Sequence, residues 1–99
     1  MPMDIAEFQR LIRERYYATD SARGAAGTFL WFAEEVGELA KAIGQHERGD
    51  PPAANQAELE DEFADVLAWL ATLANITGVD LDEAVRKKYV EGGGPKGTK

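Results

Sequence analysis

Carboxylate side chains recur at helical spacing in two separate stretches of the chain. Glu34, Glu35 and Glu38 lie in the first stretch, and Glu62 and Asp65 lie in the second. Residues three or four positions apart are neighbours on a helix surface, where like charges repel by roughly a few tenths of a kcal/mol. In a partly covered position such acids need a cation to neutralise them. Because oxygen-only ligands suit Mg²⁺ or Mn²⁺ rather than Zn²⁺, the two stretches predict a site for such an ion.

Apolar residues repeat at steps of three and four through both acidic stretches, which predicts two helices, over 29–43 and 55–76. On the second helical wheel, Glu62 falls at the edge of the apolar arc and is therefore expected to be partly covered. The apolar positions are Phe29, Phe32, Val36, Leu39 and Ile43 in the first stretch, and Leu59, Phe63, Val66, Leu70, Leu73 and Ala74 in the second.

Capping signals predict two further helices, over 5–18 and from Leu81 onward. The segments 20–27 and 44–54 are rich in turn-forming residues and are expected to be loops. No stretch alternates as a strand would, so the fold class expected is all-α, of the four-helix-bundle type. The expected N-caps are Asp4 with Glu7 in a capping box, Thr28, Asn55, and Asp80 with Glu83, and Gly78 is expected to end the third helix.

Length and charge restrict the class of protein. With 99 residues we expect one domain over 1–91, followed by a flexible Gly/Lys tail over 92–99. The net charge of −7 argues against binding a nucleic acid polymer, which depends on Lys and Arg. No run of 18 apolar residues predicts a membrane span, and the absence of cysteine and of a visible secretory signal is typical of a cytoplasmic protein.

The two acidic stretches also resemble a known family. Glu34-Glu35-x-x-Glu38 followed by Glu62-x-x-Asp65 looks like the EExxE…ExxD signature of the MazG-type all-α nucleotide pyrophosphohydrolases. The residues around the signature, 27–39, 65–70 and 78–85, are similar as well, and the resemblance covers roughly residues 4–90. It implies Mg²⁺-dependent hydrolysis of nucleoside triphosphates to a monophosphate and pyrophosphate, with Mn²⁺ as a substitute metal. It also implies homodimers or homotetramers whose bundles are completed between subunits.

Carried over by position, the resemblance makes Glu35, Glu38, Glu62 and Asp65 the Mg²⁺ ligands. Glu34 would hold an additional metal or orient the attacking water. Either Glu34 or Glu38 would accept the proton from that water, which makes these two the catalytic candidates.

Three further residues are candidates for binding substrate: Trp31, Asn75 and Lys88. Trp31 lies away from the main apolar arc of its helix, so it borders a ligand pocket or packs against another helix or subunit. Asn75 follows Asp65 along its helix and would hydrogen-bond ribose or base, or else serve as an ordinary polar residue near a helix end. Lys88 would contact phosphate, although Gly92-Gly93-Gly94 stands where many relatives carry an Asn and basic residues.

Two other functions stay open from the sequence. A non-catalytic acidic helical bundle, serving assembly or regulation, would use the same acids as a solvated face. A related metal-dependent enzyme would act on another phosphate substrate, such as phosphoribosyl-ATP. The favoured function is triphosphate hydrolysis, with removal of non-canonical nucleotides as a physiological role.

Overall fold

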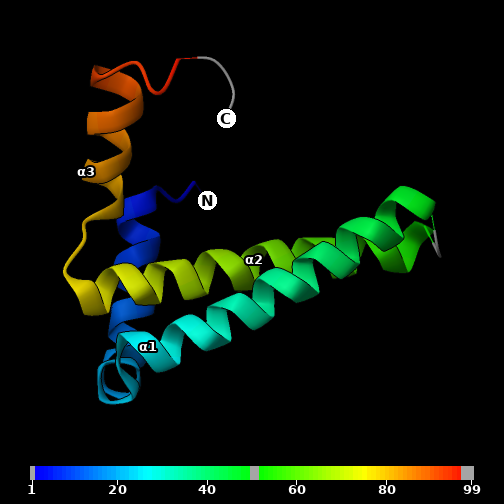
Figure 1. Ribbon diagram of the computed structural model, residues 1–99, viewed down its shortest axis with the longest axis horizontal. Coiled ribbons are helices and arrows are strands. Elements are labelled where there is room, and N and C mark those ends of the chain that lie inside the picture. The colour runs from blue at the N-terminus through cyan, green and yellow to red at the C-terminus, as the bar shows by residue number, and fades with distance from the viewer. Residues whose placement is uncertain (1, 50–51, 97–99) are drawn as a thin grey trace.

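The computed structural model describes residues 2–49 and 52–96, without the side chains of residues 52–54, and every regular element in that part is helical. The all-α fold class is therefore confirmed there. Figure 1 shows two long helices side by side and a shorter helical arm that rises from one end of the pair. The elements are α1 (Ile5–Arg48), α2 (Pro52–Thr77), α3 (Leu81–Val85) and the π-helix η1 (Arg86–Glu91).

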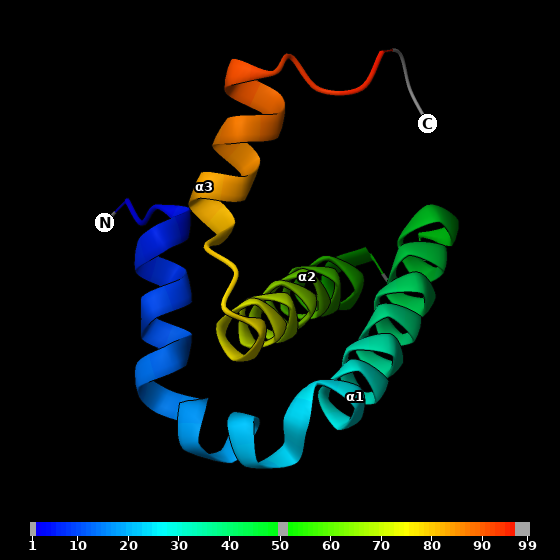
Figure 2. The same cartoon turned by 60° about the vertical axis from the view of Figure 1, so that its left-hand side comes forward.

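The helix α1 is bent sharply at Gly24, and Figure 2 shows the part before this residue turning away from the remainder. Gly24 has φ 84° and ψ 169°, a conformation that is open almost only to glycine. The expected loop over 20–27 is therefore wrong, because one glycine makes the whole turn while its neighbours stay helical. Thr28, the expected N-cap, lies fully buried inside α1 instead.

The turn between α1 and α2 is shorter than the loop expected over 44–54. The helix α1 continues to Arg48 and ends at Gly49, whose φ of 71° gives the left-handed C-cap typical of glycine. The helix α2 begins at Pro52, because proline suits the first helical turn. Asn55 is therefore a buried residue inside α2 rather than its N-cap. Residues 50 and 51 of the expected turn lie outside the described residues.

The predicted signals at the start of α1, the end of α2 and the start of α3 are confirmed. Asp4 and Glu7 form a reciprocal capping box at the start of α1. Gly78, with φ 77°, follows the end of α2, and the side chain of Asp80 accepts a hydrogen bond from the backbone N–H of Glu83. Beyond Glu91 the described residues 92–96 are not helical. The division between a domain over 1–91 and a tail over 92–99 stays a prediction, and residues 97–99 lie outside the described residues.

The side chain of Gln9 holds α3 against the first third of α1. Its Nε2 donates to the carbonyl of Val79 at 2.7 Å and to Asn75 Oδ1 at 3.1 Å, and its Oε1 accepts from the backbone N–H of Leu81 at 2.9 Å. Asn75 in turn donates to the carbonyl of Gln9 at 3.2 Å. These bonds fix the α2–α3 connection, so the arm begins at a defined angle.

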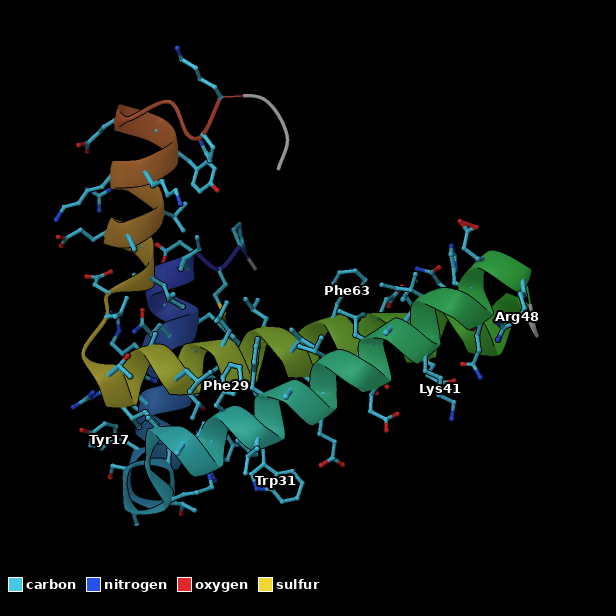
Figure 3. All side chains as sticks on the ribbon, viewed as in Figure 1. Tyr17, Phe29, Trp31, Lys41, Arg48 and Phe63 are labelled. Atoms are coloured by element: carbon cyan, nitrogen blue, oxygen red, sulfur yellow. The ribbon has the colours of Figure 1, made fainter. Side chains whose placement is uncertain are left out.

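One chain buries little apolar surface between its helices. Among the described residues the buried apolar side chains are Ile12, Ala42, Ala71 and Ala74, most of them small. Figure 3 shows Phe63 and Trp31 projecting to opposite sides of the paired helices. The described chain thus forms a helical pair and an arm rather than a closed four-helix bundle. Large apolar side chains left exposed along the pair include Phe29, Val36, Ile43, Phe63, Leu67 and Leu70.

Within the described part of the chain, no single helix is both long and apolar enough to cross a membrane. Only the bent pair Asn55–Thr77 with Leu81–Glu91 reaches that length and composition.

Candidate active site

Three carboxylates from the two long helices converge. Glu35 on α1 and Glu62 and Asp65 on α2 each offer an oxygen, and these oxygens all lie within 4.8 Å of one another. Glu35 and Glu62 are half-buried and Asp65 is exposed. The pairing of α1 with α2 therefore brings together acids that the sequence placed on separate helices, and Glu62 is partly covered as its wheel position predicted.

Glu62 carries an oxygen that the protein leaves without a partner. Its Oε2 is buried and has no hydrogen bond. A buried carboxylate oxygen without a donor is costly, and a metal ion is one of the partners that offsets this cost. The orphan oxygen, beside two further carboxylates, therefore fits a cation at this position.

Burial and neighbouring negative charges raise the pKa of two of the three acids, Glu35 and Glu62. Burial raises the pKa of Glu35 above its ordinary value, and the charge of Asp65 raises it further. Burial is also the largest cause that raises the pKa of Glu62, followed by the charges of Glu35 and Asp65. The surroundings thus disfavour the ionised forms of Glu35 and Glu62. A divalent cation bound among the oxygens would instead favour these ionised forms.

Glu34 and Glu38 flank this carboxylate cluster, defined as Glu35, Glu62 and Asp65. The charge of Glu38 contributes to the raised pKa of both Glu35 and Glu62, and that of Glu34 contributes to that of Glu35. Both residues are exposed to solvent. Their positions suit a role beside the cluster in contact with water, and their assignment as ligand or base stays a prediction.

Two indole rings stack next to the cluster. Trp31 on α1 and Trp69 on α2 have ring centroids 6.3 Å apart and planes 13° apart. The guanidinium of Arg23 lies over the Trp69 ring, 5.0 Å from its centroid. Trp31 remains 48% exposed. Packing against another helix, one of the alternatives given for Trp31, is therefore observed, and contacts with substrate or with another subunit stay predictions.

A cavity of about 380 Å³ opens beside Asp65. Asp65, Ala68, Trp69 and Thr72 line it from α2, and their spacing of three, four and seven residues places them on one face of that helix. The remaining wall comes from the part of α1 before Gly24: Ile12, Tyr16, Thr19, Asp20 and Arg23. The bend at Gly24 is what folds this part of α1 back toward α2.

Apart from Asp65, the polar residues of this cavity were not predicted from the sequence. Asp20 and Thr72 are buried, and Asp20 forms an ion pair with Arg23. Thr72 Oγ1 donates to Asp20 Oδ2 at 3.0 Å. The only sequence signal was the i, i+3 spacing of Asp20 and Arg23, which fell in a segment expected to be a loop.

Asn75 and Lys88 lie apart from the carboxylate cluster. Asn75 borders a second cavity, of about 330 Å³, together with Gln9, Arg10 and Arg13, and its side-chain amide is bonded to Gln9. Lys88 is on the exposed π-helix, with its ammonium 5.7 Å from the ring centroid of Tyr89. The structure brings neither residue among the acids, and their roles in binding substrate stay predictions.

Known proteins similar to this chain include enzymes of nucleotide hydrolysis. Residues 24–91 match the model of the MazG nucleotide pyrophosphohydrolase domain. The chain is 34% identical over 88 residues to a dATP/dGTP diphosphohydrolase of cyanophage S-2L, covering 89% of this chain and 72% of that protein. It is also 32% identical over 97 residues to the uncharacterized protein YvdC of Bacillus subtilis strain 168, covering 85% and 88%. The matched residues include Glu35, Glu62 and Asp65, which converge between α1 and α2, and the chain belongs to the MazG nucleotide pyrophosphohydrolase family.

Proposed function

We propose that this protein hydrolyses nucleoside triphosphates between the α- and β-phosphates, releasing a nucleoside monophosphate and pyrophosphate, with Mg²⁺ as its cofactor. The observation that carries the proposal is the convergence of Glu35, Glu62 and Asp65, with a buried Glu62 oxygen that lacks a partner. A solvated acidic face, as in an assembly module, would not leave a carboxylate oxygen buried and orphaned.

The carboxylate cluster would hold the ion, with Glu38 as a further ligand. Bound there, Mg²⁺ would neutralise the phosphate charge and lower the pKa of a water molecule. The protein's own contribution would be to position the phosphates and to accept the proton of the attacking water. Glu34 or Glu38 would be the proton acceptor. Most of the rate acceleration would then come from positioning and electrostatics.

We propose that the protein works as a homodimer or homotetramer. The apolar side chains left exposed along α1 and α2 support this, since a second helical pair placed on them would complete a four-helix bundle. With this activity we also propose a location in the cytoplasm and a role in removing non-canonical nucleotides.

The substrate class needs its own evidence. The cyanophage relative is named for dATP and dGTP, so purine deoxynucleotides come first in a substrate panel. Trp31, Asn75 and Lys88 are retained as candidate substrate contacts. Phosphoribosyl-ATP belongs in the panel as the alternative phosphate substrate.

The test measures pyrophosphate and orthophosphate released from each nucleotide with Mg²⁺. We expect pyrophosphate and monophosphate in equal amounts, without orthophosphate. Glu35→Gln and Asp65→Asn should lower turnover by orders of magnitude while circular dichroism stays helical. Glu14→Gln, an exposed acid on the first third of α1, is the matched control and should keep full activity. Orthophosphate as the sole product, or near-normal rates in both site variants, would overturn the proposal.

A further inference from the structure

The cavity beside Asp65 is lined in part by polar groups that the phosphate chemistry does not use. Asp20 and Thr72, which line it, are 5% and 4% exposed. Asp20 Oδ1 accepts from Arg23 Nη2, and Asp20 Oδ2 accepts from Thr72 Oγ1 at 3.0 Å. Arg23 Nε donates to Thr28 Oγ1 at 3.2 Å, which fixes the guanidinium in place. Asp20, Arg23 and Thr72 therefore form a preorganised hydrogen-bond network in the cavity wall.

Asp20 and Thr72 can only accept hydrogen bonds from a ligand, whereas the donors of this network are the remaining N–H groups of Arg23. The single proton of the Thr72 hydroxyl is committed to Asp20, so the free lone pairs of Thr72 Oγ1 can only accept. The Asp20 carboxylate is an acceptor as well, with lone pairs left beyond its two bonds. A ligand group placed against Asp20 and Thr72 must bring a proton of its own.

The network of Asp20, Arg23 and Thr72 lies about two helical turns along α2 from the carboxylate cluster. Asp65 belongs to both the cluster and the cavity wall, and Thr72 follows it by two turns on the same face of α2. At 1.5 Å of rise per residue this separates them by about 10 Å along the helix. Trp69 lies between them and is held by Trp31 and Arg23, so it forms a fixed wall.

We infer that this cavity takes the base of the substrate, and that Asp20 and Thr72 accept a hydrogen bond from an exocyclic amino group on it. This inference rests on the proposed function, since the phosphates would lie at the carboxylate cluster. Bases that carry an amino group are preferred over analogues with a carbonyl at the same position. A carbonyl oxygen placed there would face acceptors that have no proton to give, and such a mismatch is what a polar site rejects.

Two nucleotide pairs test the inference, because the members of each pair carry either an amino group or a carbonyl at the same ring position, with the adjacent ring nitrogen unprotonated or protonated accordingly. They are dCTP with dUTP, and dATP with dITP. We expect kcat/KM to be higher for the amino member of each pair by about 3- to 10-fold, the value of one hydrogen bond. Thr72→Val should bring the ratio of kcat/KM between the amino and carbonyl members toward one in both pairs. Thr72→Ser, which retains a hydroxyl, should keep both ratios. Thr77→Val makes the same change outside the cavity and should leave both ratios unaltered.

Equal efficiencies within both pairs for the native protein would overturn the inference, and so would unchanged ratios in Thr72→Val. If that variant does not fold by circular dichroism, the ratios of the native protein still decide. Failure of the proposed function has a different signature, since no nucleotide of the panel would then release pyrophosphate.

Discussion

An oxygen of Glu62 on α2 lies within 4.8 Å of an oxygen of Glu35 on α1, although the two residues belong to different helices. The contact exists because the two helices run side by side from the turn at Gly49, which places their acidic stretches opposite each other (Figure 1). Two half-buried carboxylates this close repel unless a cation lies between them. The site is thus strained electrostatically in the metal-free protein, and this strain has measurable effects.

Stability of the metal-free protein should depend on pH through Glu62. Its folded pKa is raised above the ordinary value of 4.5, so the folded state binds more protons than the unfolded state above that pH. The free energy of unfolding therefore decreases as pH rises from 4.5 through the raised folded pKa. Glu62→Gln should show a smaller decrease, since only the raised pKa of Glu35 then contributes to it, and should be more stable than the native protein at pH 7. Urea unfolding in EDTA across this range measures it. Glu14→Gln should follow the native curve, and a Glu62→Gln curve parallel to the native one would refute the prediction.

Gly24 should not tolerate a side chain. A Cβ at this position meets no atom within 4 Å, so any cost arises from the backbone alone. With φ 84° and ψ 169°, Gly24→Ala should destabilise the protein by about 1–3 kcal/mol. Urea unfolding at constant pH gives the difference directly.

Gly37 supplies the matched control for that substitution. It lies within α1 with no positive φ, and its Cβ would also meet nothing within 4 Å. Gly37→Ala should therefore stabilise α1 by roughly 0.5–1 kcal/mol. Effects of the same sign at both positions would contradict the account of the bend.

Gln9 should control how α3 docks. Gln9→Ala removes the bonds to Val79, Asn75 and Leu81, and leaves the part-buried N–H of Leu81 without its acceptor. We expect a loss of about 1–3 kcal/mol and faster hydrogen exchange at the Leu81 amide. Gln56→Ala, which removes only an exposed bond to Glu60, should change neither. An unaltered exchange rate at Leu81 would show that other contacts hold the arm.

The sequence predicted the acids better than it predicted the chain path around them. The positions of Glu35, Glu62 and Asp65 follow from helical periodicity, which is local, and both helices were expected. The bend was missed because a glycine inside a polar, small-residue stretch indicates a loop, while a single residue with positive φ suffices to turn a helix. The bond between Asp20 and Thr72 joins residues far apart in sequence and depends on that bend, so no local pattern contains it.

Direct binding of a divalent cation to the nucleotide-free protein tests the central claim. Isothermal titration with Mn²⁺ should give saturable binding to the native protein and to Glu14→Gln. Replacing Glu62 with Gln should weaken that binding by at least about tenfold, because it removes an anionic ligand. Equal binding by the native protein and Glu62→Gln, or only weak and unsaturable binding by both, would contradict the assignment of Glu35, Glu62 and Asp65 as the metal site.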